Sequence, residues 1–158
     1  MLHAPDDVGV AIATGGEDWE WAKWLPHTHE PDAAGEAGVV PLVAEDFEGI
    51  ADYLRTRLDQ ASAPQDIRRS LLDRDAPDTR RRLVVVLDRY DPRSAWARSE
   101  LATDLTAAAG PGTGITVICL VDRENDEPTR ADIRVRVDEN STLTLEGRRG
   151  DPALRSPT

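Results

Sequence analysis

Short apolar runs separated by polar segments form the clearest pattern along the chain. The runs are Val8 to Ala13, Val39 to Ala44, Leu83 to Leu87 and Ile115 to Val121. Continuous apolar runs of this length, rich in β-branched residues and bounded by turn residues, predict strands buried on both faces. The runs at 83–87 and 115–121 are expected to be central strands of the sheet.

Three helices are predicted between these runs. The first covers Asp18 to Trp24, because acidic residues occupy its first turn and Pro26 follows its end. The second follows Asp46, a suitable cap, and has an apolar face formed by Phe47, Ile50, Ala51, Leu54 and Leu58. The third covers Ser94 to Ala108 and ends at a glycine-rich loop. Strands alternating with helices predict an α/β fold with a mainly parallel sheet and flanking helices.

The C-terminal third has a different pattern. Apolar and polar residues alternate over 133–138 and again over 143–146, which predicts a half-exposed β-hairpin at one edge of the sheet. Residues 61–79 are polar and charged and are expected to form a charged loop or insertion, and residues 148–158 a flexible tail. We therefore expect a single α/β domain over residues 1–147.

Length and charge limit the possible functions. The 158 residues fit one domain, and the net charge of -11 argues against binding to nucleic acid phosphates. The basic run Arg80 to Arg82 directly precedes the strand at 83–87, so we interpret it as a solvated strand entry.

Cys119 is the chain's single cysteine and lies within an apolar run. We interpret it as a small core residue in a reducing compartment, with a reactive thiol as the alternative. No run approaches the roughly 18 apolar residues of a membrane span, and the first residues lack a signal peptide's pattern. A cytoplasmic location is therefore expected.

The most unusual stretch is 19–27, which holds three of the four tryptophans and the only lysine. Tryptophan and leucine at these spacings can anchor a helix on a sheet, and proline ends that helix. We expect a structural role for the residues Trp19, Trp21, Trp24, Leu25, Pro26 and His27.

Asp88 follows the most apolar strand, where an acid can hold a magnesium ion in a nucleotide-binding protein. A phosphate-binding loop with the pattern Gly-x-x-x-x-Gly-Lys-Ser/Thr is missing, and residue 89 is Arg where a second acid would be needed. The alternative role for Asp88 is to cap the turn that begins at Arg89. No catalytic residue is predicted.

His27 and His29 form a His-x-His pair that could hold a metal with a third ligand from Glu30, Asp32 or His3. None of these is a clear third ligand, so turn-stabilising hydrogen bonds are favoured. No metal site is predicted.

The order of segments 5–8, 19–27, 83–88 and 114–117 resembles the FtsK/SpoIIIE-type ATPases, and most closely the EccC-type membrane motors of actinobacterial type VII secretion. The stretch 19–27 is the specific part of this likeness. The resemblance places Asp88 at the Walker B position and Arg123 as the remnant of a sensor motif. The missing phosphate-binding loop and the incomplete sensor motif depart from the pattern of a working ATPase. In this respect the chain resembles the degenerate RecA-like, P-loop NTPase-like module between the membrane helices and the first ATPase module of these motors. Its phosphate-binding loop and first helix would precede Met1.

The resemblance implies a non-catalytic regulatory or assembly module in the cytoplasmic portion of an inner-membrane ATPase. The parent protein would bind ATP and Mg, whereas this chain alone would bind no cofactor. Implied partners are other modules of the parent and of a hexamer, components of the type VII membrane complex and, through the parent, secreted WXG-type proteins. No direct nucleic acid partner is expected. The alternatives are a fragment of an FtsK-like DNA-translocating ATPase and a standalone α/β binding domain.

Overall fold

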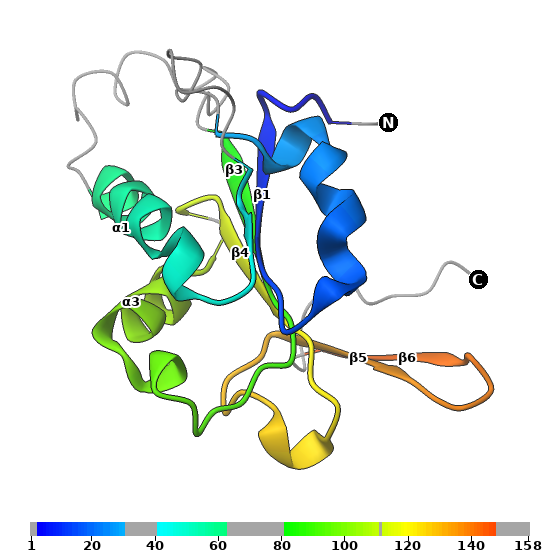
Figure 1. Cartoon of the computed structure of the whole chain (residues 1–158). Helices are drawn as coiled ribbons and strands as arrows, with labels where there is room; N and C mark the ends of the chain where they lie inside the picture. The colour runs from blue at the N-terminus through cyan, green and yellow to red at the C-terminus, as the bar shows by residue number, and fades with distance from the viewer. Residues whose placement is uncertain (1–2, 31–40, 63–80, 111, 148–158) are drawn as a thin grey trace. The chain divides into compact units, whose positions relative to one another are not determined.

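The structure is a computed structural model that describes residues 3–30, 41–62, 81–110 and 112–147 (Figure 1). The chain divides into two compact units, Met1–Glu127 and Pro128–Thr158. Within the described ranges, no helix has the length and apolar character needed to cross a membrane.

The first unit contains a four-stranded sheet in which every pair of neighbours is parallel. Its strands are β1 (Val8–Ala13), β2 (Val43–Ala44), β3 (Arg82–Leu87) and β4 (Ile115–Cys119), in the order β2-β1-β3-β4. The predicted α/β class with a mainly parallel sheet is confirmed. The chain runs from β1 outward to β2, and then returns to β3 on the other side of β1, so the topology switches between β1 and β3.

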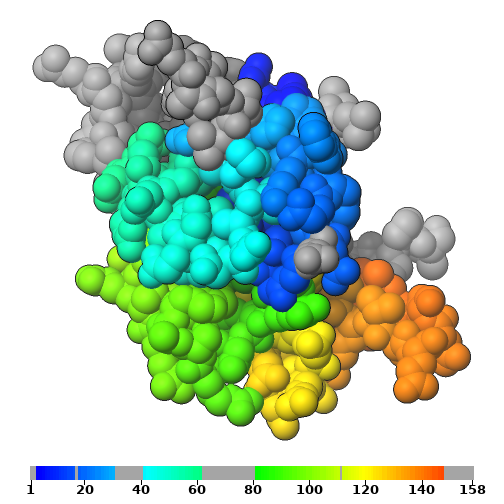
Figure 2. Space-filling view, viewed as in Figure 1, coloured from blue at the N-terminus to red at the C-terminus, as the bar shows by residue number. Residues whose placement is uncertain are grey.

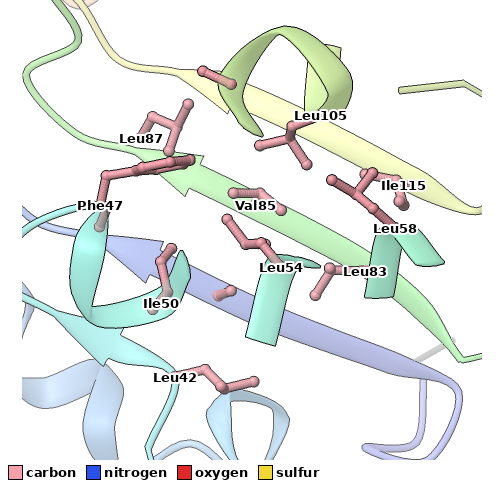
Figure 3. Packing of buried hydrophobic residues seen from close by; sticks show 13 residues of the cluster. Leu42, Phe47, Ile50, Leu54, Leu58, Leu83, Val85, Leu87, Leu105 and Ile115 are labelled. Carbon is pink, nitrogen blue, oxygen red and sulfur yellow. The ribbon is translucent and has the colours of Figure 1, made fainter. Parts of the chain in front are cut away.

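One face of the sheet lies under two α-helices, α1 (Glu48–Ser62) and α3 (Glu100–Ala108) (Figure 1). The Oδ1 atom of Asp46 accepts a hydrogen bond from the Gly49 backbone N–H at 3.0 Å, so the predicted cap is confirmed. Figure 3 shows the side chains of α1 directed onto β1 and β3. The buried side chains on this face include Phe47, Ile50, Leu54, Leu58, Leu83, Val85, Leu87 and Leu105.

The opposite face lies under two 3₁₀-helices, η1 (Glu17–Trp24) and η2 (Pro26–Thr28). In Figure 1, the blue η1 segment stands on the side of the sheet away from α1 and α3. The buried cluster here is small and consists of Ile12, Ala22, Val43 and Val86.

Two predictions about β4 and the preceding helix were wrong. The single helix predicted for 94–108 is interrupted, because η4 (Trp96–Arg98) ends at Ser99, whose Oγ caps α3 by accepting the Ala102 N–H at 3.2 Å. Strand β4 is an edge strand and not a central one. Ile118 of this strand is 42% exposed.

The second unit contains the predicted hairpin, formed by the antiparallel strands β5 (Ile133–Val137) and β6 (Leu143–Gly147). These strands form a two-stranded sheet of their own and do not extend the parallel sheet. Another short 3₁₀-helix, η5 (Glu124–Asp126), follows β4 in the first unit.

Three predicted segments lie partly or wholly outside the described residues. The strand predicted for 39–44 is described only from residue 41 and is observed as β2. Of the predicted charged loop at 61–79, only residues 61 and 62 are described, and they end α1. The predicted tail at 148–158 is outside the described part.

Candidate functional site

The candidate site lies where β1 and β3 end. In open parallel sheets, ligands bind beyond the carboxyl ends of the strands at the point where the topology switches. Here that point is occupied by the segment after β1, which leads into η1, and by the turn after β3. The sequence thus places the tryptophan stretch and Asp88 at the same edge of the sheet.

A hydrogen bond joins these two segments. The indole Nε1 of Trp19 donates to Oδ2 of Asp88 at 3.0 Å across 69 positions of sequence. The other carboxylate oxygen, Oδ1, accepts the backbone N–H of Arg89 at 3.0 Å. Both oxygens of Asp88 therefore have a partner, and the second bond is the turn-capping contact considered from the sequence.

Arg89 completes the contact between the two segments. Its backbone is left-handed, with φ of 49°, and its Nη1 donates to the carbonyl oxygen of Gly15 at 2.9 Å. A Cβ added at Gly15 would lie 2.6 Å from Cδ of Arg89, so this close approach requires glycine. The guanidinium thus lies across the loop that follows β1.

The tryptophans of η1 divide into packed and exposed residues. Trp19 packs against the small buried cluster and stacks on Trp21 with ring centroids 5.9 Å apart. Trp21 remains 59% exposed and Trp24 86% exposed. The expected anchoring role therefore fits Trp19, whereas Trp24 contributes little to the packing of the chain.

A surface hollow of about 350 Å³ opens beside this contact, and we call it the tryptophan–aspartate hollow. In Figure 2, the blue segment, the green turn after β3 and the yellow segment after β4 meet on the displayed face. Three carboxylates and one guanidinium give the hollow a net negative lining. The lining residues are Asp18, Trp19, Trp21, Asp88, Arg89 and Asp122.

A second hollow of about 360 Å³ lies between α1 and α3 and contains none of the site residues predicted from the sequence. Its lining includes Phe47, Arg55 and Asp104. This hollow does not lie at the point where the strand order of the sheet switches.

The end of the tryptophan stretch is held by backbone contacts. Pro26 begins η2 after the extended residue Leu25. The Oγ1 atom of the fully buried Thr28 lies 2.8 Å from the carbonyl oxygens of both Ala22 and Leu25. This hydroxyl ties η2 back onto η1, and the sequence reasoning did not identify it.

The two histidines considered for a metal both contact backbone carbonyls. His27 Nε2 lies 3.0 Å from the carbonyl oxygen of His3, and His29 Nε2 lies 3.0 Å from that of Lys23. Among the residues that the structure describes, no group of three or more His, Cys, Asp or Glu side chains is arranged to hold a metal ion.

Arg81 has a role that the sequence reasoning missed. Instead of being solvated, its guanidinium is partly buried and donates to the carbonyl oxygens of Pro5, His27 and His29 at 2.8 to 3.2 Å. The prediction of a solvated strand entry is therefore wrong for Arg81, although the neighbouring Arg82 is exposed. Gly9, the second residue of β1, leaves room for this side chain, because an added Cβ would lie 2.9 Å from the Cζ atom of Arg81.

Two other predicted residues lie apart from this contact. Arg123 is exposed and precedes η5, and it does not line the hollow. Its sensor role stays a prediction, as does the Walker B assignment of Asp88. Cys119 is partly buried, and burial raises the pKa of its thiol to about 11. The thiol is therefore protonated near neutral pH, which favours the core role over the reactive one.

The fold and the site define a parallel α/β domain in which an indole and a guanidinium cover the strand ends. No family model matches the chain. It is similar to the ESX secretion system protein EccC of Thermomonospora curvata, with 28% identity over 143 residues, which are 85% of this chain and 9% of that protein. It is also similar to the ESX-4 secretion system protein EccC4 of Mycobacterium tuberculosis, with 35% identity over 46 residues, or 27% of this chain and 4% of that protein.

The chain thus spans less than a tenth of the length of the curated relatives it matches. The similarity relates it to one region of EccC-type secretion proteins. It supports the relation to EccC-type proteins that the tryptophan stretch predicts, but not the assignment to a particular module of them.

Proposed function

We propose that this chain is a non-catalytic regulatory or assembly module of an EccC-type ATPase that drives type VII protein secretion. In this proposal, the module belongs to the cytoplasmic portion of a membrane-anchored hexamer. ATP and Mg are bound by other modules of the parent, which also contact the secreted WXG-type proteins.

The observation that carries the proposal is the Trp19–Asp88 hydrogen bond. An acid that holds a magnesium-bound water must present its oxygens to the metal site. At Asp88, one oxygen accepts the indole N–H and the other accepts a backbone N–H. This carboxylate acts as a structural acceptor that fastens η1 to the sheet.

The residues around Asp88 do not suit a magnesium nucleotide. Phosphate binding needs a glycine-rich loop with a lysine, and the single lysine of the chain, Lys23, is paired with Glu20 at 2.6 Å. The residue after Asp88 is an arginine, bonded to the Gly15 carbonyl, where hydrolysis needs a second acid. We therefore assign no catalytic step to this chain.

The similarity to EccC supports the choice of parent. The matched region covers 85% of this chain but only 9% of the Thermomonospora curvata protein. A module of this size leaves most of such a parent for membrane attachment and ATP hydrolysis.

The test is ATP turnover by the full chain and by the parent protein carrying Asp88→Asn. We expect no turnover by the chain. We expect the parent variant to retain most of its rate, because the asparagine oxygen can still accept one hydrogen bond. Loss of a catalytic carboxylate would instead lower the rate by about 100-fold or more.

Asp122→Asn is the matched control, since it removes the same charge at an exposed position near Asp88. Robust ATP turnover by the chain that Asp88→Asn abolishes and Asp122→Asn preserves would overturn the proposal.

A further inference from the structure

We propose that the tryptophan–aspartate hollow binds an arginine or lysine side chain of a partner protein. Such binding depends only on the surface of this chain and would hold for any parent. Its failure would leave the proposed regulatory role unaffected.

The winding of η1 sets which of its side chains face outward. In a 3₁₀-helix, side chains three positions apart lie above one another on the same face. The row of Trp19 and Ala22 faces the sheet, and Ala22 is completely buried. The row of Asp18, Trp21 and Trp24 is exposed. A carboxylate and two indoles are therefore aligned on one outward face.

Two of the three indoles of η1 are exposed to solvent. Trp21 and Trp24 are 59% and 86% exposed, although indoles bury more area than most side chains when a partner is available. Exposed tryptophans next to a hollow are typical of protein interaction sites, where tryptophan and arginine dominate the binding energy. The small apolar cluster under η1 does not need either ring.

The net negative charge of the lining favours a cation over an anion. Each oxygen of Asp88 already accepts a hydrogen bond, whereas the carboxylates of Asp18 and Asp122 are exposed to solvent. The nearest guanidinium nitrogen to Asp18 is that of Arg89 at 3.9 Å, and Asp18 is 85% exposed. Within the described ranges, Asp122 has no ion pair or hydrogen bond from its side chain. These carboxylates would repel an anionic ligand and attract a cation.

Indole rings and carboxylates together select a particular cation. A guanidinium or ammonium group is attracted to the face of tryptophan, and more strongly when carboxylates lie nearby. At about 350 Å³, the hollow is near the lower end of the size range of ligand pockets, which suits one side chain. Trp24 does not line the hollow but is outward-facing on the same row, so it can contact apolar residues flanking the cation.

This last feature favours a protein segment over a free metal ion or a small amine, because neither of those would use Trp24. The net charge of -11 also accelerates association with a basic partner. We therefore assign the hollow to a basic residue flanked by apolar residues.

The experiment titrates the full chain with an acetylated peptide of sequence Ala-Leu-Arg-Arg-Leu-Ala, and with the same peptide carrying citrulline, which is neutral, in place of arginine. Indole N–H resonances are followed by NMR. We expect the arginine peptide to shift the signals of Trp21 and Trp24. The signal of Trp96 should stay in place, because this residue packs against the buried cluster under α1 and α3. The citrulline peptide should bind far more weakly, and added salt should lower the affinity for the arginine peptide.

Variants locate the binding. Trp21→Ala should lower the affinity about tenfold, and Asp122→Asn about threefold. The matched control is Asp59→Asn, which removes one exposed carboxylate from α1 and should leave the affinity unchanged. The Trp96 signal confirms that each variant is folded.

Three outcomes would overturn the proposal. One is equal binding of the arginine and citrulline peptides. Another is an unchanged affinity in Trp21→Ala. The third is self-association of the chain, measured by sedimentation, that Trp24→Ala abolishes while no peptide binds, because this face would then be an interface between copies.

Discussion

One face of the four-stranded sheet lies under α1 and α3, and the other lies under η1 and η2. The face under α1 and α3, which we call the helix-covered face, buries 13 side chains of the described residues in one cluster. The cluster on the opposite face has only four. On the second face, specific polar bonds add to this packing: Trp19 to Asp88, Arg81 to three carbonyls, and Thr28 to two carbonyls.

The difference separates stability from positioning. Apolar burial is non-directional and scales with area, so the helix-covered face supplies most of the stability. Hydrogen bonds contribute less free energy but fix geometry. The second face therefore holds η1 in one place and presents its outer row of indoles in a fixed arrangement.

The largest expected effect is on the helix-covered face. Leu54 of α1 is completely buried and points onto the sheet (Figure 3). Leu54→Ala should lower the free energy of unfolding by about 3 kcal/mol, measured by urea denaturation. Leu25→Ala is the control on the other face, where the side chain is 37% exposed and the loss should stay below about 1 kcal/mol. Equal losses would contradict the comparison.

The next effect concerns Arg81. Arg81→Lys keeps the charge but replaces a forked donor with a point charge that cannot reach all three carbonyls. We expect a loss of about 2 kcal/mol in urea denaturation. Arg82→Lys changes an exposed neighbour and should stay within about 0.5 kcal/mol. A similar small loss for both variants would mean that Arg81 does not hold this face together.

A smaller effect is expected at the Trp19–Asp88 bond. Trp19→Phe keeps an aromatic ring but removes the N–H donor, and should cost about 1 kcal/mol. In a double-mutant cycle with Asp88→Ala, the two losses should be non-additive by about 0.5 kcal/mol or more. Trp24→Phe, at an 86% exposed position, should change stability little. Strict additivity would show that the bond does not contribute.

The smallest effect is a pH dependence at Cys119, which packs against the helix-covered core. Burial raises the pKa of its thiol from 9.0 to about 11, so the folded state retains this proton when the unfolded chain loses it. The stabilising contribution is complete below about pH 9 and is lost as the pH rises through about 11. Cys119→Ala should remove this part of the decline in unfolding free energy, compared over pH 8 to 11. An identical decline in both proteins would contradict the prediction.

Much of the helix-covered face could be predicted from the sequence. Uniform apolar runs marked β1 and β3, and Asp46 with its apolar row marked α1. These signals are local and repeat along the chain. The break at Ser99 was missed because the apolar pattern continues through a residue whose side chain caps a new helix.

The other face was harder to predict, because its contacts join distant positions. Trp19 and Asp88 were both singled out, but nothing in a single sequence indicates a bond across 69 residues. Arg81 looked like part of a solvated basic run, since a run of three arginines does not by itself reveal that the guanidinium of Arg81 is partly buried. The 3₁₀ winding of η1 was also hidden, because a segment of eight residues is too short to distinguish a period of three from 3.6.

Lys23 gives this surface a practical property. It is the only lysine in the chain and lies within η1, between the two exposed tryptophans. Amine-directed cross-linkers therefore have one side-chain attachment point, beside the outward row. A partner captured through that amine must approach η1, so mass spectrometry of the conjugate would identify the neighbouring protein and the residue that touches it.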